Sequence, residues 1–309
     1  MTSMAYGVRI GGMTSWSSSD IPDQSGRVFV VTGANSGLGL VASRELAAKG
    51  AFVVMACRDV EKGNRVRADM MPGGDERSQV RYLDLADLES VHRFADDWGD
   101  RPISVVINNA GVMNTPLRRT VQGHELQFGT NVLGHFALMQ RLWGVVTDRT
   151  VWLGSIAHRM GRPDLTDVDW RSRRYSSWQA YADSKMACVM LAYEQQRRLL
   201  QAGDSRRAMA AHPGIASTDL FRSHVGKRDA NWLMGAVLST LRCSQSPEEG
   251  ALPELFAATV PHLAGGSYAG PGGVAGVVGA PRVEKSIRRS YDVAAGRQLW
   301  QVCESLTTR

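Results

Sequence analysis

Short apolar runs separated by longer amphipathic segments recur along this 309-residue chain. The runs are too continuously apolar to alternate between a buried and an exposed face, so they predict strands that are covered on both sides. The amphipathic segments between them predict right-handed helical crossovers. The predicted strands span residues 27–32, 51–57, 79–85, 103–108, 150–155 and 206–212. This order predicts an α/β fold, a doubly wound Rossmann fold with a mostly parallel sheet.

The chain shows no internal repeat and no linker that would divide it after residue 27. We therefore expect a single domain over 27–309, preceded by a flexible arm over 1–26. The arm lacks a long apolar run, which argues against a secretory signal. The glycine-rich stretch 265–281 is expected to carry a last strand and a loop near the site. The amphipathic stretch of about 215–245 is expected to form a substrate lid.

Composition narrows the class of protein. The net charge is +6, but the arginines are scattered and no nucleic-acid-binding motif accompanies them, which argues against a nucleic-acid partner. No apolar stretch approaches the roughly 20 residues of a spanning helix, and peripheral contact with a membrane stays open. The cysteines lie far apart without metal-like spacing, which predicts reduced thiols, a cytoplasmic protein and no metal site. They are Cys57, Cys188, Cys243 and Cys303.

The stretch "TGANSGLG", residues 32–39, follows the first predicted strand directly and precedes a helical segment. Glycines let the backbone approach a pyrophosphate, and the dipole of a helix N-terminus favours its negative charge. Turns also use glycines without any ligand, but the position directly after the first strand favours a dinucleotide site.

The residues after the second predicted strand bear on the type of cofactor. An NAD site usually places an acid there for the ribose hydroxyls, whereas this strand ends with Cys57 and Arg58. Arg58 would face a 2′-phosphate as a charge-assisted partner. Asp59 is the competing acid, and it equally suits the N-terminal cap of the next helix. The sequence thus favours NADP(H).

Polar residues at the ends of later strands are the candidates for chemistry. Asn131, inside an apolar helix, needs partners, so its amide either braces the backbone or holds a water. Ser155 ends a strand at the edge where open α/β sheets bind ligands. Tyr181 and Lys185 are four residues apart, on one helix face. They are either an exposed polar pair or an acid/base pair in which the ammonium stabilises the phenolate.

These motifs, in this order, resemble the short-chain dehydrogenase/reductase superfamily. The matching stretches are "TGANSGLG", "DL" at 84–85, "NNAG" at 108–111, Asn131, Ser155, "YADSK" at 181–185 and "HPGIAST" at 212–218. More narrowly, "MACRDVEKG", "GSIAH", "WQAYADSKMACVM" and "RQLWQVCESLT" resemble the retinol-dehydrogenase-like branch.

The resemblance implies a role for each matching residue. Tyr181 would be the general acid/base, and Lys185 would bind the nicotinamide ribose and favour the phenolate. Ser155 would hydrogen-bond the substrate oxygen, and Asn131 would hold a water in a proton relay. The remaining implied cofactor contacts are Gly33, Asn35, Ser36, Gly37, Leu38, Gly39, Asp84, Leu85, Asn109, Ala110, Gly111, Pro213, Gly214, Ile215 and Thr218.

The 25 residues between Ser155 and Tyr181 make an extra loop, a length typical of the retinol-dehydrogenase-like branch. Its aromatic residues either line an apolar pocket or pack the loop onto the body. They are Trp170, Tyr175 and Trp178. His158 is a weak candidate for a second base, because the tyrosine already fills that role.

The predicted function is NADP(H)-dependent interconversion of an alcohol and a carbonyl on a lipophilic small molecule such as a retinoid, steroid or fatty aldehyde. A non-catalytic NADP(H)-binding redox sensor is the main alternative, and an epimerase or dehydratase is a third class. The presence of Asn131, Ser155, Tyr181 and Lys185 together favours the enzyme. Helix pairing of the kind that this family uses leads us to expect a homodimer.

Overall fold

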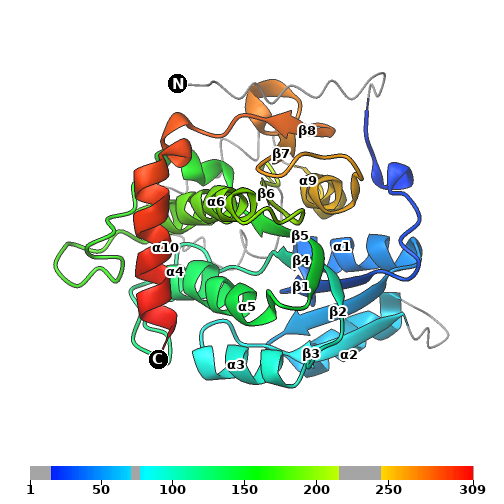
Figure 1. Ribbon diagram of the computed structural model, residues 1–309, viewed down its shortest axis with the longest axis horizontal. Helices are drawn as coiled ribbons and strands as arrows, with labels where there is room; N and C mark the ends of the chain where they lie inside the picture. The colour runs from blue at the N-terminus through cyan, green and yellow to red at the C-terminus, as the bar shows by residue number, and fades with distance from the viewer. Residues whose placement is uncertain (1–14, 71–76, 216–244, 309) are drawn as a thin grey trace.

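The computed structural model describes residues 15–70, 77–215 and 245–308, which form a sheet of eight strands between two helical layers (Figure 1). The strand order is β3-β2-β1-β4-β5-β6-β7-β8, and every neighbouring pair is parallel except β7 with β8. This arrangement confirms the predicted doubly wound, mostly parallel sheet. The strands are β1 (Val28–Thr32), β2 (Phe52–Cys57), β3 (Ser78–Tyr82), β4 (Ile103–Asn108), β5 (Val146–Leu153), β6 (Arg207–Ala211), β7 (Tyr268–Pro271) and β8 (Pro281–Glu284).

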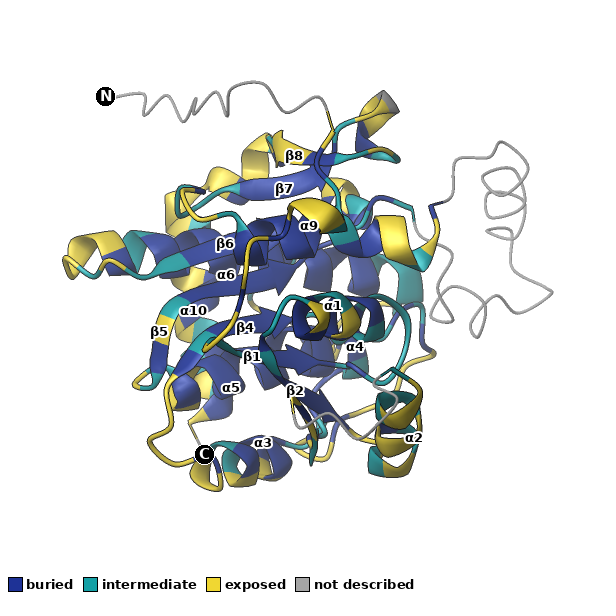
Figure 2. Ribbon diagram, turned by 90° about the vertical axis from the view of Figure 1, so that its right-hand side faces the viewer, coloured by how far each residue is buried: buried dark blue, intermediate teal, exposed yellow. Residues whose placement is uncertain are grey.

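Two apolar clusters, one on each face of the sheet, attach the helices to it. Figure 2 shows buried strands in the middle and exposed positions on the outer sides of the helices. One face carries α1 (Gly37–Ala48), α2 (Val60–Met70) and α9 (Pro247–Thr259). The other carries α3 (Leu88–Asp96), α5 (His135–Leu142), α6 (Ser177–Gln201) and α10 (Val293–Thr307). Ahead of α5, the short α4 (Leu126–Phe128) runs into a π-helix, η2 (Gly129–Gly134).

β5 starts four residues earlier than predicted and ends two residues before the predicted bound. Its first half contains Asp148 and Arg149, which made that half resemble a loop in the sequence. Arg149 is buried, and its guanidinium donates to the carbonyl oxygens of Ala257 at 3.2 Å and Val260 at 2.9 Å, at the C-terminal end of α9. The C-terminus of a helix stabilises a cation, so a distant segment makes this charged residue compatible with a buried strand.

The described part of the predicted N-terminal arm and the glycine-rich stretch both pack against the sheet and its helices. Trp16, from the predicted arm, packs edge to face on Phe256 of α9 with ring centres 5.4 Å apart. Residues 265–281 contain β7, as predicted, and β8 follows as an antiparallel edge strand. The loop between them lies against the site, because Val277 O accepts from Ile215 N at 3.1 Å. Residues 216–244 of the predicted lid lie outside the described residues.

Candidate active site

Six of the predicted site segments follow the C-terminal ends of parallel strands. The glycine turn follows β1, Arg58 follows β2, and Asp84 comes shortly after β3. The "NNAG" stretch runs out of β4, Ser155 follows β5, and Pro213 follows β6. Because these strands are parallel, their C-terminal ends share one edge of the sheet, where open α/β sheets bind ligands.

The glycine turn fits closely against the end of β4. The amide Nδ2 of Asn109 donates to Thr32 O at 2.7 Å, and Ala110 N donates to Thr32 Oγ1 at 2.9 Å. A methyl group on Gly39 would clash with this same Asn109 amide and with the carbonyl of Gly33. The turn therefore needs a glycine there, and it opens directly into the N-terminus of α1. Such a backbone cradle at a helix N-terminus fits a pyrophosphate.

The two residues after β2, Arg58 and Asp59, were the competing candidates for the adenosine ribose, and the structure gives them different surroundings. Asp59 Oδ1 accepts from Lys62 N at 2.8 Å, so this acid caps α2. Asn35 Nδ2, in the glycine turn, donates to Asp59 O at 3.2 Å, which places the end of β2 beside the turn. Arg58 is exposed at this point. An exposed guanidinium next to the dinucleotide turn is suited to a 2′-phosphate.

The predicted adenine segment is anchored to the π-helix. Asp84 N donates to Ser90 Oγ at 2.9 Å, and its carboxylate accepts from Ala86 N at 2.9 Å. Leu85 is buried, and its backbone lies against Gly134. A side chain at position 134 would clash with the carbonyl oxygen of Leu85. The segment after β3 and the π-helix that carries Asn131 therefore form one packed unit.

Tyr181 and Lys185 are both buried, with exposed fractions of 6% and 4%. Lys185 Nζ donates to Leu153 O, at the end of β5, at 2.9 Å. The same nitrogen lies 6.0 Å from the centre of the Tyr181 ring. An ammonium in a site with little water acts more strongly on a neighbouring phenol than it does on a surface. The arrangement therefore suits proton transfer by Tyr181.

Ser155 and Tyr181 meet through the short helix η3 (Ile156–Met160). Ser155 Oγ accepts from Ala157 N at 3.2 Å, which caps this helix. Ala157 packs with Met113 around the Tyr181 ring, and Trp178 lies against the same ring with centres 5.8 Å apart. Ala157 thus joins the serine hydroxyl, through its backbone N–H, to the apolar cluster that contains Tyr181.

The side chain of Asn131 braces the backbone. Its Oδ1 accepts from Val112 N at 2.8 Å, and its Nδ2 donates to Val112 O at 3.0 Å and to Ser184 Oγ at 2.9 Å. Of the two roles left open by the sequence, the observed contacts show the brace. The residue lies in a π-helix, a distortion that is frequent at functional sites.

Gly111 lies between Asn131 and Lys185, two of the predicted catalytic residues. A methyl group on Gly111 would lie 3.1 Å from Asn131 Oδ1 and 3.3 Å from Lys185 Nζ. These distances are shorter than ordinary van der Waals contacts, so either the amide or the ammonium would have to move by a few tenths of an ångström. The absence of a side chain at Gly111 therefore keeps these two polar groups in place.

We expect Gly111→Ala to lower kcat by about three- to tenfold, because a displaced Lys185 is misaligned with Tyr181. The measurement is steady-state turnover with the cofactor at saturation. Gly144→Ala is the matched control, since a methyl group there would meet no atom within 4 Å. Equal kcat values for the two variants would show that the site tolerates the displacement.

The segment after β6 is held by the glycine-rich loop and by Gln245. Gln245 Nε2 donates to Pro213 O at 2.8 Å, and Gln245 N donates to Ile215 O at 2.8 Å. Gly214 packs against the carbonyl of Val277. These contacts fix the predicted nicotinamide segment up to Ile215. Thr218, the last residue predicted for it, lies outside the described residues.

Three residues near the site have functions that the motifs do not show. His158 is buried, its Nδ1 donates to Ser155 O at 2.6 Å, and its Nε2 accepts from Ile287 N at 3.3 Å. Burial lowers the pKa of His158 to about 4, so the ring braces the serine backbone as a neutral group. Thr32 and His135 form a second buried contact, with Oγ1 and Nε2 2.8 Å apart. The contacts of His158 with Ile287 and of Thr32 with His135 join residues that are more than 100 positions apart, so the sequence pattern does not reveal them.

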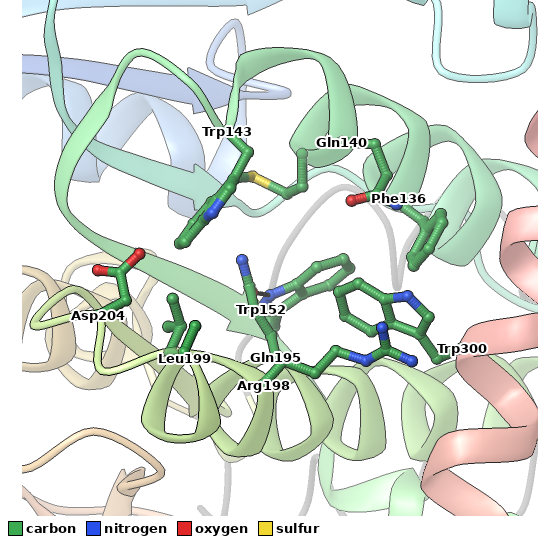
Figure 3. Close-up of a pocket in the computed structure, with 11 residues that line it drawn as sticks. Phe136, Gln140, Trp143, Trp152, Gln195, Arg198, Leu199, Asp204 and Trp300 are labelled. Atoms are coloured by element: carbon green, nitrogen blue, oxygen red, sulfur yellow. Dashed lines mark hydrogen bonds between the residues drawn. The ribbon is translucent and has the colours of Figure 1, made fainter.

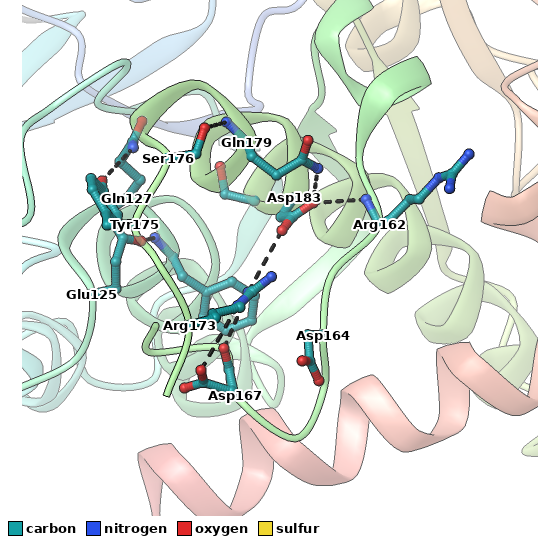
Figure 4. A network of polar contacts seen from close by, with 12 residues as sticks. Glu125, Gln127, Arg162, Asp164, Asp167, Arg173, Tyr175, Ser176, Gln179 and Asp183 are labelled. Atoms are coloured by element: carbon teal, nitrogen blue, oxygen red, sulfur yellow. Dashed lines mark hydrogen bonds and ion pairs between the residues drawn. The ribbon is translucent and has the colours of Figure 1, made fainter. Parts of the chain in front are cut away.

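Two aromatic residues of the extra loop pack onto the body of the protein. Tyr175 donates its hydroxyl proton to Glu125 Oε1 at 2.9 Å and accepts from Gln127 Nε2 at 3.0 Å (Figure 4). Burial and the Glu125 carboxylate raise the pKa of Tyr175 to about 12. Trp170 is buried beneath the Arg173 guanidinium, 3.6 Å from its ring centre. Of the three aromatics, Trp178 is the one that contacts Tyr181.

Asp183, within the "YADSK" stretch, anchors the other side of this loop (Figure 4). Its carboxylate accepts from Arg162 N at 2.7 Å and from Gln179 Nε2 at 2.7 Å, and it pairs with Arg173 at 3.8 Å. Burial raises the pKa of this carboxyl. The extra loop is therefore tied directly to the helix that carries the predicted catalytic pair, Tyr181 and Lys185.

A cavity of about 190 Å³ lies between α5, α6, β5 and α10 (Figure 3). Trp143, Trp152 and Trp300 form much of its wall, and the amide of Gln195 lies among them. Among the predicted catalytic and cofactor residues that the structure describes, none lines this cavity. It is thus separate from the niche around Tyr181.

Comparison with known proteins agrees with this geometry. Residues 27–161 match the family model described as short chain dehydrogenase. Retinol dehydrogenase 13 of Homo sapiens is 35% identical, with 89% of this chain and 82% of that protein covered. Polyprenol dehydrogenase of Mus musculus is 37% identical, with 88% and 83% covered. A crystal structure of an uncharacterised protein from Mycobacterium paratuberculosis has 43% identity and a TM-score of 0.81, with 96% and 98% covered.

The chain therefore belongs to the short-chain dehydrogenase/reductase superfamily, in its retinol-dehydrogenase-like branch, which confirms the resemblance seen in the sequence. Membership places it among oxidoreductases that act on alcohol and carbonyl groups. A Pseudomonas aeruginosa RhlG/NADP active-site complex, 24% identical with a TM-score of 0.61, shares the fold.

Proposed function

We propose that the protein is an NADP(H)-dependent oxidoreductase that interconverts an alcohol and a carbonyl group on a lipophilic small molecule. The buried ammonium of Lys185 carries this proposal: Leu153 O holds it beside the Tyr181 ring, at the sheet edge that also carries the glycine turn. Relatives named for retinol and polyprenol, both lipophilic alcohols, support the substrate class.

In the proposed mechanism, Tyr181 gives its phenol proton to the carbonyl oxygen during reduction and takes it back during oxidation. Lys185 stabilises the phenolate, and its remaining N–H groups are available to ribose hydroxyls. Ser155 Oγ donates to the substrate oxygen as negative charge develops on it. The nicotinamide, when bound, supplies or accepts the hydride. Asn131, braced against Val112, keeps the surroundings of Lys185 fixed.

Apolar side chains around the reacting phenol support a lipophilic substrate. Trp178 and Met113 pack around the Tyr181 ring, so the position of the reacting oxygen is bordered by apolar surface. The test is NADPH oxidation with retinaldehyde, a steroid ketone and a fatty aldehyde of medium length. Turnover of none of them, with NADPH still bound, would favour the redox-sensor alternative.

We expect NADPH to bind at least about tenfold more tightly than NADH, and Arg58→Ala to remove this preference, because the guanidinium is the partner proposed for the 2′-phosphate. Nicotinamide fluorescence titrations of both cofactors measure the four dissociation constants. Arg65→Ala is the control, since Arg65 is an exposed arginine on the adjacent helix α2. If NADH and NADPH bind the wild type equally, the proposed cofactor preference is wrong.

The proposal includes a cytoplasmic homodimer with peripheral access to membrane-borne substrates. Within the described ranges, no helix has the length and apolar character needed to cross a bilayer. α10 packs across α6 and α5 in the same chain and covers apolar positions of α6 (Figure 1). A dimer of this protein would therefore pair through a surface other than that covered side of α6.

A further inference from the structure

A fully buried histidine joins three segments that surround the cofactor turn and the catalytic lysine. His135, the first residue of α5, has Nε2 2.8 Å from Thr32 Oγ1, at the end of β1. Its Nδ1 lies 2.9 Å from the carbonyl oxygen of Asn131, in the π-helix. Thr32 Oγ1 also accepts from Ala110 N at 2.9 Å. One imidazole thus connects β1, the π-helix and, through Thr32, the "NNAG" stretch.

The partners assign every proton in this chain of hydrogen bonds. A carbonyl oxygen only accepts, so Nδ1 of His135 carries the proton that bonds Asn131 O. Nε2 is then the acceptor, and Thr32 gives its hydroxyl proton to this nitrogen at 2.8 Å rather than to the more distant Ile107 O at 3.4 Å. Burial lowers the pKa of His135 to about 4, and the nearby Lys185 ammonium acts in the same direction. The ring is therefore neutral at physiological pH and fully occupied by the two segments that it links.

The carbonyl of Asn131 is held from two sides. His135 directly follows the π-helix, four residues after Asn131, and its ring reaches back to this oxygen. Cys188 Sγ, on α6, donates to the same oxygen at 3.3 Å. Because the Asn131 side chain is bonded to Val112 and Ser184, the residue is fixed at both ends.

We propose that His135 is a positioning residue that keeps Asn131, and with it the surroundings of Lys185, in register with the glycine turn that receives the pyrophosphate. This inference rests on the proposed function and adds a residue to it. One half of the imidazole acts on the cofactor turn through Thr32, and the other half acts on the catalytic side through Asn131. The two halves are expected to affect different constants.

Two amide substitutions separate the halves. In His135→Asn the amide nitrogen takes the place of Nδ1 and keeps the bond to Asn131 O, while the bond to Thr32 is lost. In His135→Gln the amide takes the place of Nε2 and keeps the bond to Thr32, while the bond to Asn131 is lost. We expect the asparagine variant to weaken NADPH binding by about three- to tenfold, with kcat within about threefold of wild type. We expect the glutamine variant to lower kcat by at least about tenfold, with NADPH binding within about threefold.

The thermal stability of the variants and a substitution of Thr32, the other partner in the hydrogen bond to Nε2, serve as controls. Each of the two variants leaves one former partner of the imidazole without its hydrogen bond, so their Tm values should fall by similar amounts. Their kcat values and their dissociation constants for NADPH should nevertheless differ from each other. Thr32→Val removes the hydrogen bond between Thr32 and His135 without altering His135. It should therefore weaken NADPH binding and leave kcat nearly unchanged, as His135→Asn does. Thr32→Ser should restore wild-type binding. If kcat and the Kd for NADPH changed equally in both variants, in proportion to the loss in Tm, His135 would have only a packing role.

Failure of this inference is distinguishable from failure of the proposed function. If wild type binds NADPH but turns over no alcohol or carbonyl compound, the proposed function fails. His135 is then judged on NADPH binding alone: weaker binding in His135→Asn and Thr32→Val, but not in His135→Gln, still supports the link to the glycine turn. If wild type is active and His135→Gln keeps its full kcat, the inference fails and the function stands.

Discussion

Replacing Tyr181 with phenylalanine is expected to lower kcat by about 10²–10⁴-fold, the contribution that general acid/base catalysis typically makes. The change removes the phenol oxygen alone. The ring keeps its contacts with Met113, Ala157 and Trp178, so the niche stays packed. NADPH binding and Tm should therefore stay at wild-type values. The measurement is single-turnover reduction of the best carbonyl substrate, with NADPH titrated by fluorescence on the same preparation.

Tyr193→Phe is the matched control for this experiment. Tyr193 lies on the same helix, is buried, and shares a hydrogen bond of 2.7 Å with Ser286 Oγ. Removing its hydroxyl is expected to cost stability and to leave kcat unchanged, because no predicted site residue contacts it. If Tyr181→Phe retained more than about a tenth of wild-type kcat, another group would have to supply the proton. If both variants lost kcat equally, the cause would be the packing of α6 instead.

The side chains of the candidate site depend on contacts with the backbone of neighbouring elements. Leu153 O receives Lys185, Val112 receives both ends of the Asn131 amide, and His158 holds the carbonyl of Ser155. Each of these contacts joins the C-terminal end of one strand to a neighbouring element. The sheet edge that is proposed to bind the cofactor therefore also orients the candidate reacting groups, which is the preorganisation that electrostatic catalysis requires.

The location of the site was predictable from the sequence because its segments follow strands. Six apolar runs gave six parallel strands, and their C-terminal ends necessarily share an edge. The use of each polar atom was not predictable in the same way. The Asn131 amide finds Val112 and Ser184, which are 19 and 53 residues distant, and the π-helix that aims it leaves no signal in the apolar spacing.

Polar residues in the interior are the other feature that periodicity misses. The first half of β5 was not predicted because it contains the charged Arg149. The carbonyl oxygens that bind this arginine belong to the end of α9, which is far away in the sequence. Glu254 is the second case. In "PEEGALPELF" a glutamate is expected on the solvated side of an amphipathic helix. The structure instead covers α9 with α1 on one side and the sheet on the other, so Glu254 has no exposed surface.

Replacing Glu254 with glutamine is expected to stabilise the protein increasingly as the pH rises from 5 to 9. Among the described residues, neither carboxyl oxygen of Glu254 has a hydrogen-bond partner. Burial raises the pKa of this carboxyl from 4.5 to about 8, although the Lys185 ammonium opposes the shift. The folded protein therefore keeps Glu254 protonated over a range of pH in which the unfolded chain has lost the proton.

The direction of the pH dependence follows from that difference in bound protons. Below pH 4.5 both states hold the proton, and wild type has the full stability that neutral Glu254 allows. As the pH rises through about 8, wild type loses at most about 5 kcal/mol in the free energy of unfolding. The glutamine variant has no proton to lose, so the difference in stability between the two proteins should be smallest near pH 4, grow between pH 4.5 and about 8, and be largest at pH 9.

Urea unfolding of wild type and Glu254→Gln at each pH unit measures this difference directly. Glu248→Gln is the matched control, because Glu248 lies on the same helix with a side chain that is 57% exposed. Its free energy of unfolding, relative to wild type, should be independent of pH. A constant difference between wild type and Glu254→Gln would mean that Glu254 ionises normally in the folded state, with a counter-charge or water at the buried carboxyl. A growing difference would mean that the folded protein holds Glu254 as a neutral acid near neutral pH, and that its ionisation under alkaline conditions weakens the fold.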